Sequence, residues 1–307
     1  MRIVFLGTPE IAKTCLTEIL KTNHEVLAVV TKPDKPVGRG KKLAFSPVKE
    51  LALEHNIPVY QFNSLSKEGV GILKNLKPDL LVLVAFGQIL SQEILDIALP
   101  INLHGSLLPK YRGPSPIQTA ILNGDEESGV TIMKMEKEVD SGDILLQEKI
   151  KIEKEDTSAD LFEKMANTGA KALVKCLELI ESGNAIFKKQ DQSKATFTTM
   201  FTKENAVINF EENVDKIVNK VRAYNPSPVA YLMIEDTQYK IYKAQKYDNL
   251  VGNYKIGEIV FANGKQGLVI KAKDGFVEIL ELQAPNGKIM PAKQYLNGKS
   301  IETGIVV

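Results

Sequence analysis

The sequence predicts an α/β fold in which a doubly wound, mostly parallel sheet is followed by a small C-terminal β-barrel. Three early segments, 2–6, 26–31 and 80–86, are almost continuously apolar, as strands buried on both faces are. Helical patterns separate these segments, which is typical of crossovers between parallel strands. Beyond residue 207 the pattern changes to short β-branched runs broken by Asn-Gly and Asp-Gly pairs, which are hairpin-turn signals.

Length and composition limit the class of protein. A chain of 307 residues is typical of two domains, and 44% hydrophobic with 25% charged residues is ordinary for a soluble globular protein. The net charge of +1 is too small for the protein as a whole to attract a polyanion, so any polyanion must bind to a local patch of basic residues. The first residues indicate a strand rather than a signal peptide, and the longest apolar run, 80–87, is too short to cross a bilayer. The two cysteines, Cys15 and Cys176, have no metal-ligand companions nearby in the sequence. A cytoplasmic protein with no metal and no membrane partner is therefore expected.

Several helices are expected in order along the chain. Residues 11–20 predict the first, and residues 46–55 predict a second with Pro47 at its start. Residues 155–183 predict a long amphipathic helix that Thr157 and Asp160 cap and Gly183 ends, with Cys176 on its core face.

The periodicity ends after this long helix. Residues 184–205 are polar, and a short helix follows at 214–221. We therefore expect an N-terminal domain at 1–188, a linker at 189–206 and a C-terminal domain at 207–307. Hairpin turns are expected within the C-terminal domain at Asn263-Gly264, Asp274-Gly275 and Asn286-Gly287.

The segment around Asn102 and His104 carries the clearest chemistry. Side chains at i and i+2 of a strand share one face, so Asn102 and His104 would point into a cleft while Ile101 and Leu103 pack inside. Gly105 then breaks the strand, at the kind of terminus where open α/β sheets bind ligands. Asp140, in the loop 139–143, is the best carboxylate partner for the imidazole. The structural alternative is that Asn102 and His104 are a buried pair whose hydrogen bonds are satisfied within the protein.

Three other segments also have a functional and a structural interpretation. Gly7-Thr8-Pro9 is a poor dinucleotide fingerprint because Pro9 stands where the second glycine belongs. His24 and His55 lie in polar connections, where exposed structural roles are expected. The basic segment 31–42 would ordinarily be a solvated loop, but it follows the second strand at the sheet edge where the Asn102 strand also ends.

Together, Asn102, His104, Asp140 and the segment HGSLLPKYRG resemble the 10-formyltetrahydrofolate-dependent formyltransferases. The resemblance implies a Rossmann-like catalytic domain, 10-formyltetrahydrofolate as formyl donor, no metal, and catalysis by these three residues. Asn102 would donate to the oxyanion, His104 would stabilise it or give a proton to the departing nitrogen, and Asp140 would take the amine's proton. The folate-binding residues it implies are Phe86, Gly87, Gln88, Ile89 and Leu90 for the pterin, and Ser106, Leu107, Leu108 and Pro109 for the formyl end.

The basic segment resembles the PxxPxGRGKK insertion of the methionyl-tRNA formyltransferases. This implies a monomer that formylates the α-amine of initiator methionyl-tRNA for translation initiation. Lys35, Arg39, Lys41 and Lys42 would bind the tRNA. Residues 222–226 and 285–288 extend the resemblance to an oligonucleotide-binding-like (OB-like) C-terminal domain.

The C-terminal domain departs from the family in two ways. Ser227 stands where the family often has tryptophan, so an aromatic platform is lost. From residue 207 onward, 13 Lys and Arg face 11 Asp and Glu, a charge of +2. Any RNA contact there is expected along a stripe such as Lys240, Lys243 and Lys246.

Three alternatives remain open. A glycinamide ribonucleotide formyltransferase would carry a different loop after the first strand and no C-terminal barrel. A sugar-nucleotide amine formyltransferase can share HGSLLPKYRG and a C-terminal domain, but the basic loop disfavours it. A noncatalytic RNA-binding protein would have lost the three catalytic side chains, which are present here.

Overall fold

A computed structural model of the chain describes residues 1–37, 42–248 and 250–307. The chain forms two compact units that interleave in sequence. The first contains Met1–Pro116, Glu127–Lys151 and Phe162–Thr198, and the second contains Ile117–Glu126, Ile152–Leu161 and Thr199–Val307. This division differs from the three consecutive segments that the sequence predicts. Residues 189–198, expected as linker, belong to the first unit because Thr196 and Thr198 exchange backbone hydrogen bonds with Arg112.

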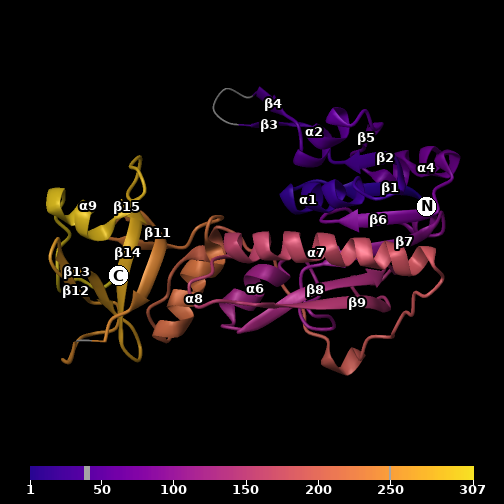
Figure 1. The fold of residues 1–307 in the computed structure, drawn as a ribbon. Helices are drawn as coiled ribbons and strands as arrows, with labels where there is room; N and C mark the ends of the chain where they lie inside the picture. The colour runs from indigo at the N-terminus through magenta and orange to yellow at the C-terminus, as the bar shows by residue number, and fades with distance from the viewer. Residues whose placement is uncertain (38–41, 249) are drawn as a thin grey trace. The chain divides into compact units, whose positions relative to one another are not determined.

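The first unit is built on a seven-stranded sheet in the order β5-β2-β1-β6-β7-β8-β9 (Figure 1). The pairs β5–β2–β1–β6–β7 are parallel, and β8 and β9 extend the sheet antiparallel. The predicted mostly parallel, doubly wound sheet is therefore confirmed. Its strands are β1 (Arg2–Gly7), β2 (Glu25–Thr31), β5 (Val59–Gln61), β6 (Leu80–Val84), β7 (Leu99–His104), β8 (Glu127–Lys134) and β9 (Ile144–Lys151).

The three helices that the sequence predicts in the N-terminal part of the chain, α1 (Glu10–Ile19), α2 (Pro47–Glu54) and α7 (Ser158–Glu181), begin and end close to the predicted residues. The Ser46 hydroxyl accepts a hydrogen bond from the Lys49 amide at 3.2 Å, which caps the helix that Pro47 starts. Thr157 and Asp160 form the predicted cap, with the Thr157 amide donating to Asp160 at 2.8 Å. Four shorter helices in the described ranges were not predicted, and they are α3 (Leu65–Glu68), α4 (Val70–Leu76), α5 (Gln92–Leu95) and α6 (Pro116–Leu122).

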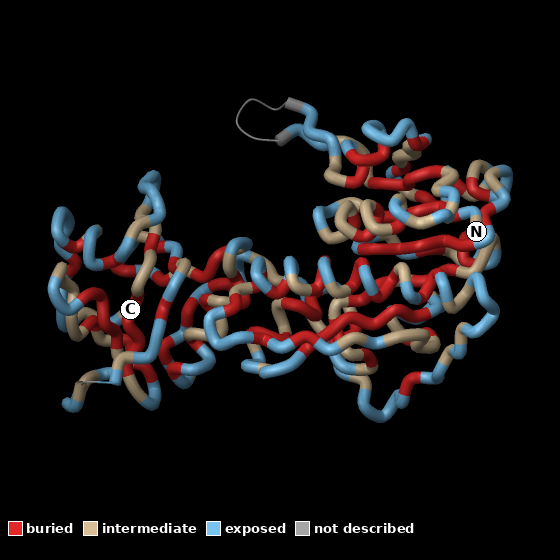
Figure 2. Tube along the Cα trace, in the orientation of Figure 1, coloured by how far each residue is buried: buried red, intermediate tan, exposed pale blue. Residues whose placement is uncertain are grey.

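Burial in the first unit is greatest at the middle of its sheet (Figure 2). Every residue of β6 is buried, as is β1 after Arg2. Helix α1 contributes Cys15, whose burial, with the nearby Glu18 charge, raises its thiol pKa to about 12. The parallel strands β2 and β6 flank β1 on opposite sides, so the order in which strands are added to the sheet reverses at β1. The loops that follow these strands therefore lie at the same edge of the sheet.

The basic segment, expected as a loop, contains two short paired strands. Strand β3 (Lys35–Val37) pairs antiparallel with β4 (Lys42–Ala44). At the start of β3 the Lys49 ammonium contacts Asp34, and this hydrogen bond lowers the pKa of the Asp34 carboxyl. Gln61 donates to Asp34 at 2.9 Å and to the Lys32 carbonyl at 2.8 Å.

The second unit contains an antiparallel sheet in the order β10-β11-β14-β13-β12, with β15 added on β14. This curved sheet is consistent with the predicted small barrel (Figure 1). The three predicted turns lie between its strands. Its elements are α8 (Val214–Tyr224), β10 (Tyr231–Ile234), β11 (Thr237–Lys246), β12 (Ile259–Asn263), β13 (Gly267–Lys271), β14 (Phe276–Gln283), β15 (Met290–Pro291) and α9 (Ala292–Gly298). Two 3-10 turns precede them in the chain, Gln192–Lys194 in the first unit and Glu204–Ala206 in the second. None of the helices in the described ranges is long and apolar enough to cross a membrane.

Candidate active site at the end of strand β7

Strand β7 places Asn102 and His104 at the carboxyl edge of the sheet. Asn102 pairs with Leu83 of β6 and Met133 of β8 in register, so its backbone is fixed on both sides. Ile101 and Leu103 are buried, as the alternation predicts. Asn102 is half-buried, and its carboxamide has no hydrogen-bond partner among the described residues. A polar group held on a rigid strand without a partner is available to a substrate.

His104 is held through both ring nitrogens. Its Nε2 lies 2.9 Å from the Tyr111 carbonyl oxygen, and its Nδ1 lies 3.5 Å from Oδ2 of Asp140. A carbonyl oxygen only accepts, so Nε2 carries a proton in this ring orientation. Nδ1 can then donate to Asp140 only when the ring is the doubly protonated cation. The side chain is 6% exposed, so little of its surface is open to direct contact with a substrate.

Asp140 lies between β8 and β9 with a backbone φ of 50°, in the left-handed region. Its Oδ2 accepts a hydrogen bond from the Gly113 amide at 2.8 Å. Its Oδ1 has no partner among the described residues and remains available as a proton acceptor. At Gly142, two residues later, a Cβ would lie 1.8 Å from the Lys134 carbonyl oxygen, so this close approach requires glycine.

The segment after His104 is a compact turn fixed by Thr131. The Thr131 hydroxyl donates to the Ser106 carbonyl at 2.6 Å and accepts from the Leu108 amide at 3.1 Å. The Ser106 hydroxyl donates to the Lys110 carbonyl at 2.6 Å, and Leu108 is buried. The side chains of Ser106 and Leu108 thus build the turn, whereas Leu107 and Pro109 are half-buried.

The segment after β6, where the pterin is expected, divides into buried and exposed residues. Phe86 and Leu90 pack in the core, and Gln88 donates to the Phe62 carbonyl at 3.0 Å and accepts from the Leu65 amide at 2.9 Å. Ile89 is 84% exposed, and Gly87 is exposed with a φ of 70°. The side chains of Phe86, Gln88 and Leu90 therefore shape the loop, and its backbone with Gly87 and Ile89 faces outward.

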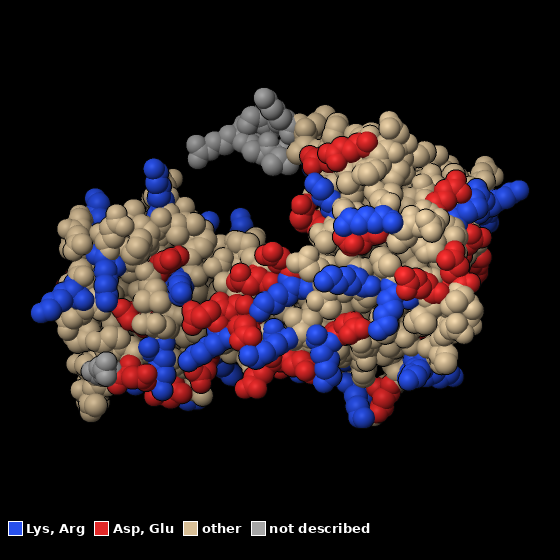
Figure 3. Space-filling model, viewed as in Figure 1, with Lys and Arg blue, Asp and Glu red and all other residues tan. Residues whose placement is uncertain are grey.

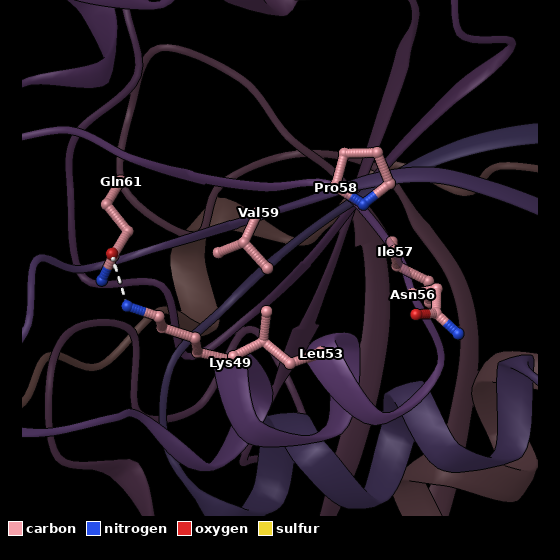
Figure 4. A pocket seen from close by; sticks show the side chains of 7 residues that line it. All are labelled: Lys49, Leu53, Asn56, Ile57, Pro58, Val59 and Gln61. Atoms are coloured by element: carbon pink, nitrogen blue, oxygen red, sulfur yellow. Dashed lines mark hydrogen bonds between the residues drawn. The ribbon is translucent and has the colours of Figure 1, made fainter.

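A hollow of about 480 Å³ lies elsewhere on the sheet, between α2 and β5 (Figure 4). Lys49 and Gln61 line it, and they hydrogen-bond to each other at 3.0 Å. Asp34 already pairs with the Lys49 ammonium. Because its charged group is satisfied inside the protein, this hollow is a weaker candidate site than the end of β7.

Sequence reasoning missed the groups that hold His104 and Asp140. The Tyr111 carbonyl and the Gly113 amide contact the two side chains directly, and buried Arg112 lies between them in sequence. Buried Gln190 bonds to Arg112 although it lies in the stretch expected as a linker. A contact made by a backbone group does not depend on the residue type, so the sequence carries no signal for it. Gln190 lies outside any periodic hydrophobic pattern.

The expected tRNA-binding residues are only partly described. Lys35 is exposed in β3, while Arg39, Lys41 and the side chain of Lys42 lie outside the described residues. In the second unit, Lys243 pairs with Glu155 at 3.3 Å and Lys246 with Asp248 at 3.1 Å, so within the described part of the chain Lys240 is the member of the expected stripe that forms no ion pair. On the face shown in Figure 3, basic and acidic side chains are interspersed, in keeping with the small net charge.

Comparison with known proteins shows the family to which the chain belongs. Residues 1–177 match the family model described as formyl transferase, and residues 200–300 match the formyl transferase C-terminal domain. The chain belongs to the formyl transferase family. It is therefore an enzyme that transfers a one-carbon formyl group, as the sequence predicts.

Its relatives carry a more specific name. The chain is 44% identical over 310 residues to a methionyl-tRNA formyltransferase of Clostridioides difficile, covering 100% of each protein. It is 42% identical over 311 residues to that of Moorella thermoacetica, covering 100% of this chain and 99% of the relative. Among solved structures, WlaRD, a sugar 3N-formyl transferase with dTDP and 5-N-formyl-THF, superposes with a TM-score of 0.69 at 25% identity over 94% of this chain and 99% of that one.

Proposed function

We propose that this chain transfers the formyl group of 10-formyltetrahydrofolate to the α-amine of initiator methionyl-tRNA. The observation that carries the proposal is the pair of unsatisfied groups at the edge of the sheet. Among the described residues the Asn102 amide and Oδ1 of Asp140 have no partner, while His104 has its Nε2 bonded to the Tyr111 carbonyl and its Nδ1 3.5 Å from Asp140. One donor, one acceptor and one cation are the groups that acyl transfer to an amine uses.

The steps follow from these groups. The α-amine attacks the formyl carbon, forming a new C–N bond and a tetrahedral oxyanion to which the Asn102 amide donates a hydrogen bond. Oδ1 of Asp140 takes the proton from the attacking nitrogen. The bond between the formyl carbon and N10 of the folate then breaks, and that proton reaches N10.

The role of His104 is narrower than the sequence allowed. Its Nε2 is bonded to the Tyr111 carbonyl and its Nδ1 faces Asp140, so giving a proton to N10 would require breaking one of these contacts. We assign the imidazolium to electrostatic stabilisation of the oxyanion and of the ionised Asp140. Removing one such group typically costs about 3 kcal/mol of barrier, or roughly 10²-fold in rate.

The remaining assignments belong to the same proposal. The backbone at Gly87 and Ile89 would bind the pterin, and the turn at Leu107 and Pro109 would face the formyl end. Lys35, Arg39, Lys41 and Lys42 of the basic segment would bind tRNA phosphates, with the OB-like C-terminal domain at 207–307 adding a smaller contribution through Lys240. The enzyme would act as a cytoplasmic monomer. Size-exclusion chromatography with light scattering tests this oligomeric state.

A sugar-nucleotide amine is the second candidate acceptor, because WlaRD covers nearly the whole chain. One assay separates the acceptors: formyl transfer from 10-formyltetrahydrofolate to charged initiator tRNA, an amino-sugar nucleotide and glycinamide ribonucleotide, each at equal concentration. We expect transfer to the methionyl-tRNA to exceed the others by orders of magnitude. Preferred transfer to the amino-sugar nucleotide would replace the proposed function with this alternative.

A further inference from the structure

We propose that Gln190 is a positioning residue that holds the Asp140 loop against His104. The inference rests on the proposed function for its catalytic consequence. Gln190 touches no reacting group itself. Its side chain lies where the loop carrying Asp140 meets the segment that holds His104, and it is 7% exposed.

The amide of Gln190 makes hydrogen bonds in two directions. Its Nε2 donates to the carbonyl oxygens of Asp140, at 2.9 Å, and of Gly142, at 2.7 Å. Its Oε1 accepts from Nη2 of Arg112 at 2.7 Å and from Nε at 3.2 Å. The amide therefore joins the loop that carries Asp140 to the side chain of Arg112.

The Arg112 segment is the other half of the site. Its neighbour Tyr111 supplies the carbonyl that binds His104 at 2.9 Å, and Gly113 supplies the amide that binds Asp140 at 2.8 Å. Gln190 thus fixes the separation between the two segments that hold His104 and Asp140. Without this link, Asp140 would depend on the Gly113 contact and on the 3.5 Å contact with His104.

The carboxamide of Gln190 supplies both functions that this position requires, an acceptor and a donor group. Arg112 is 4% exposed, forms no ion pair with a carboxylate among the described residues, and needs an acceptor. The carbonyls of Asp140 and Gly142 need donors, and a glutamate has none when ionised. The loop they belong to is also strained, because Asp140 has a left-handed φ of 50°, so external bonds are needed to maintain it.

Gln190→Glu tests the inference because it keeps the side-chain size and the acceptor for Arg112 while removing both donors. Gln192→Glu is the matched control, since Gln192 is exposed two residues away and receives the same charge. We expect Gln190→Glu to lower kcat by about 10- to 100-fold, because small misplacements of catalytic groups cost up to about 10²-fold. The KM values for folate and tRNA should change less than about twofold, and Gln192→Glu should match the wild type.

A double-mutant cycle shows whether the effect passes through Asp140. In an Asp140→Asn background, Gln190→Glu should lower kcat by less than about threefold, because the group that it positions is already altered. A purely structural role would give the same fold-loss in both backgrounds. Equal losses in the two backgrounds, or an unchanged kcat in Gln190→Glu, would overturn the inference.

A second measurement does not depend on the acceptor. With only three histidines in the chain, the ¹⁵N and ¹H signals of the His104 ring can be assigned by loss in His104→Ala. Gln190→Glu should shift these signals and Gln192→Glu should not. If the wild type fails to formylate methionyl-tRNA, the proposed function fails, while unshifted His104 signals in Gln190→Glu would separately refute the positioning role.

Discussion

Replacing Asp140 by asparagine should remove the negative charge beside His104 while leaving the fold intact. Asparagine has nearly the same shape and is one of the few residue types that tolerate the left-handed φ of 50° found here. Its side-chain oxygen can still accept from the Gly113 amide, a bond of 2.8 Å in the wild type. The free energy of unfolding should therefore change by less than about 1 kcal/mol.

The chemical consequence is much larger. With its oxygen in the place of Oδ2, the new amide still accepts from Gly113 and still faces Nδ1 of His104, while its NH₂ takes the place of Oδ1. The amide carries no negative charge, so the imidazolium assigned to the mechanism loses its anionic partner. The loss of one charge-assisted contact, about 3 kcal/mol, predicts a fall in kcat of roughly 10²-fold. Loss of the Oδ1 base would add to it.

The assay is single-turnover formyl transfer to charged initiator tRNA, with thermal unfolding and calorimetric folate binding on the same preparations. Folate affinity should stay within about twofold of the wild type, since Asp140 is assigned to the acceptor's proton and not to the pterin. A folded Asp140→Asn enzyme with at least half the wild-type kcat would refute the assignment of the carboxylate to catalysis.

Three further outcomes are expected. Asn102→Ala should lower kcat by roughly 10²-fold in the same assay with unchanged folate affinity, because it removes the free donor to the oxyanion; near-normal turnover would exclude that role. Arg39→Ala should weaken tRNA-dependent turnover at subsaturating tRNA, with only partial rescue in Arg39→Lys, since lysine lacks the paired donors that grip a phosphate. Burial, followed by the Tyr295 hydrogen bond, raises the pKa of Tyr239 from 10.0 to about 12, so this residue's contribution to stability is full below pH 10 and is lost toward pH 12. Between pH 10 and pH 12 the free energy of unfolding, measured from denaturation curves, should therefore fall less steeply with pH in Tyr239→Phe than in the wild type. The same pH dependence in both proteins would contradict the raised pKa.

Local patterns in the sequence determined the fold class and the longest helix, together with the central strands of the first sheet. Continuous apolar runs predicted β1, β2 and β6, since strands covered on both faces leave no place for polar side chains. Capping residues predicted where α2 and α7 begin, because these signals act over a single turn of helix. Asn102 and His104 followed from the alternation of a strand, which also depends only on neighbours in sequence.

The tertiary structure decided how the candidate site is held. The Tyr111 carbonyl, the Gly113 amide and Gln190 act through contacts between segments distant in sequence, and a backbone group carries no sequence signal. The expected linker illustrates the limit. Its polar residues predict solvent exposure, yet Gln190 is buried because its amide is bonded to Arg112 and to the Asp140 loop. Burial of a polar side chain depends on partners that folding brings to it, and these are set by the whole chain.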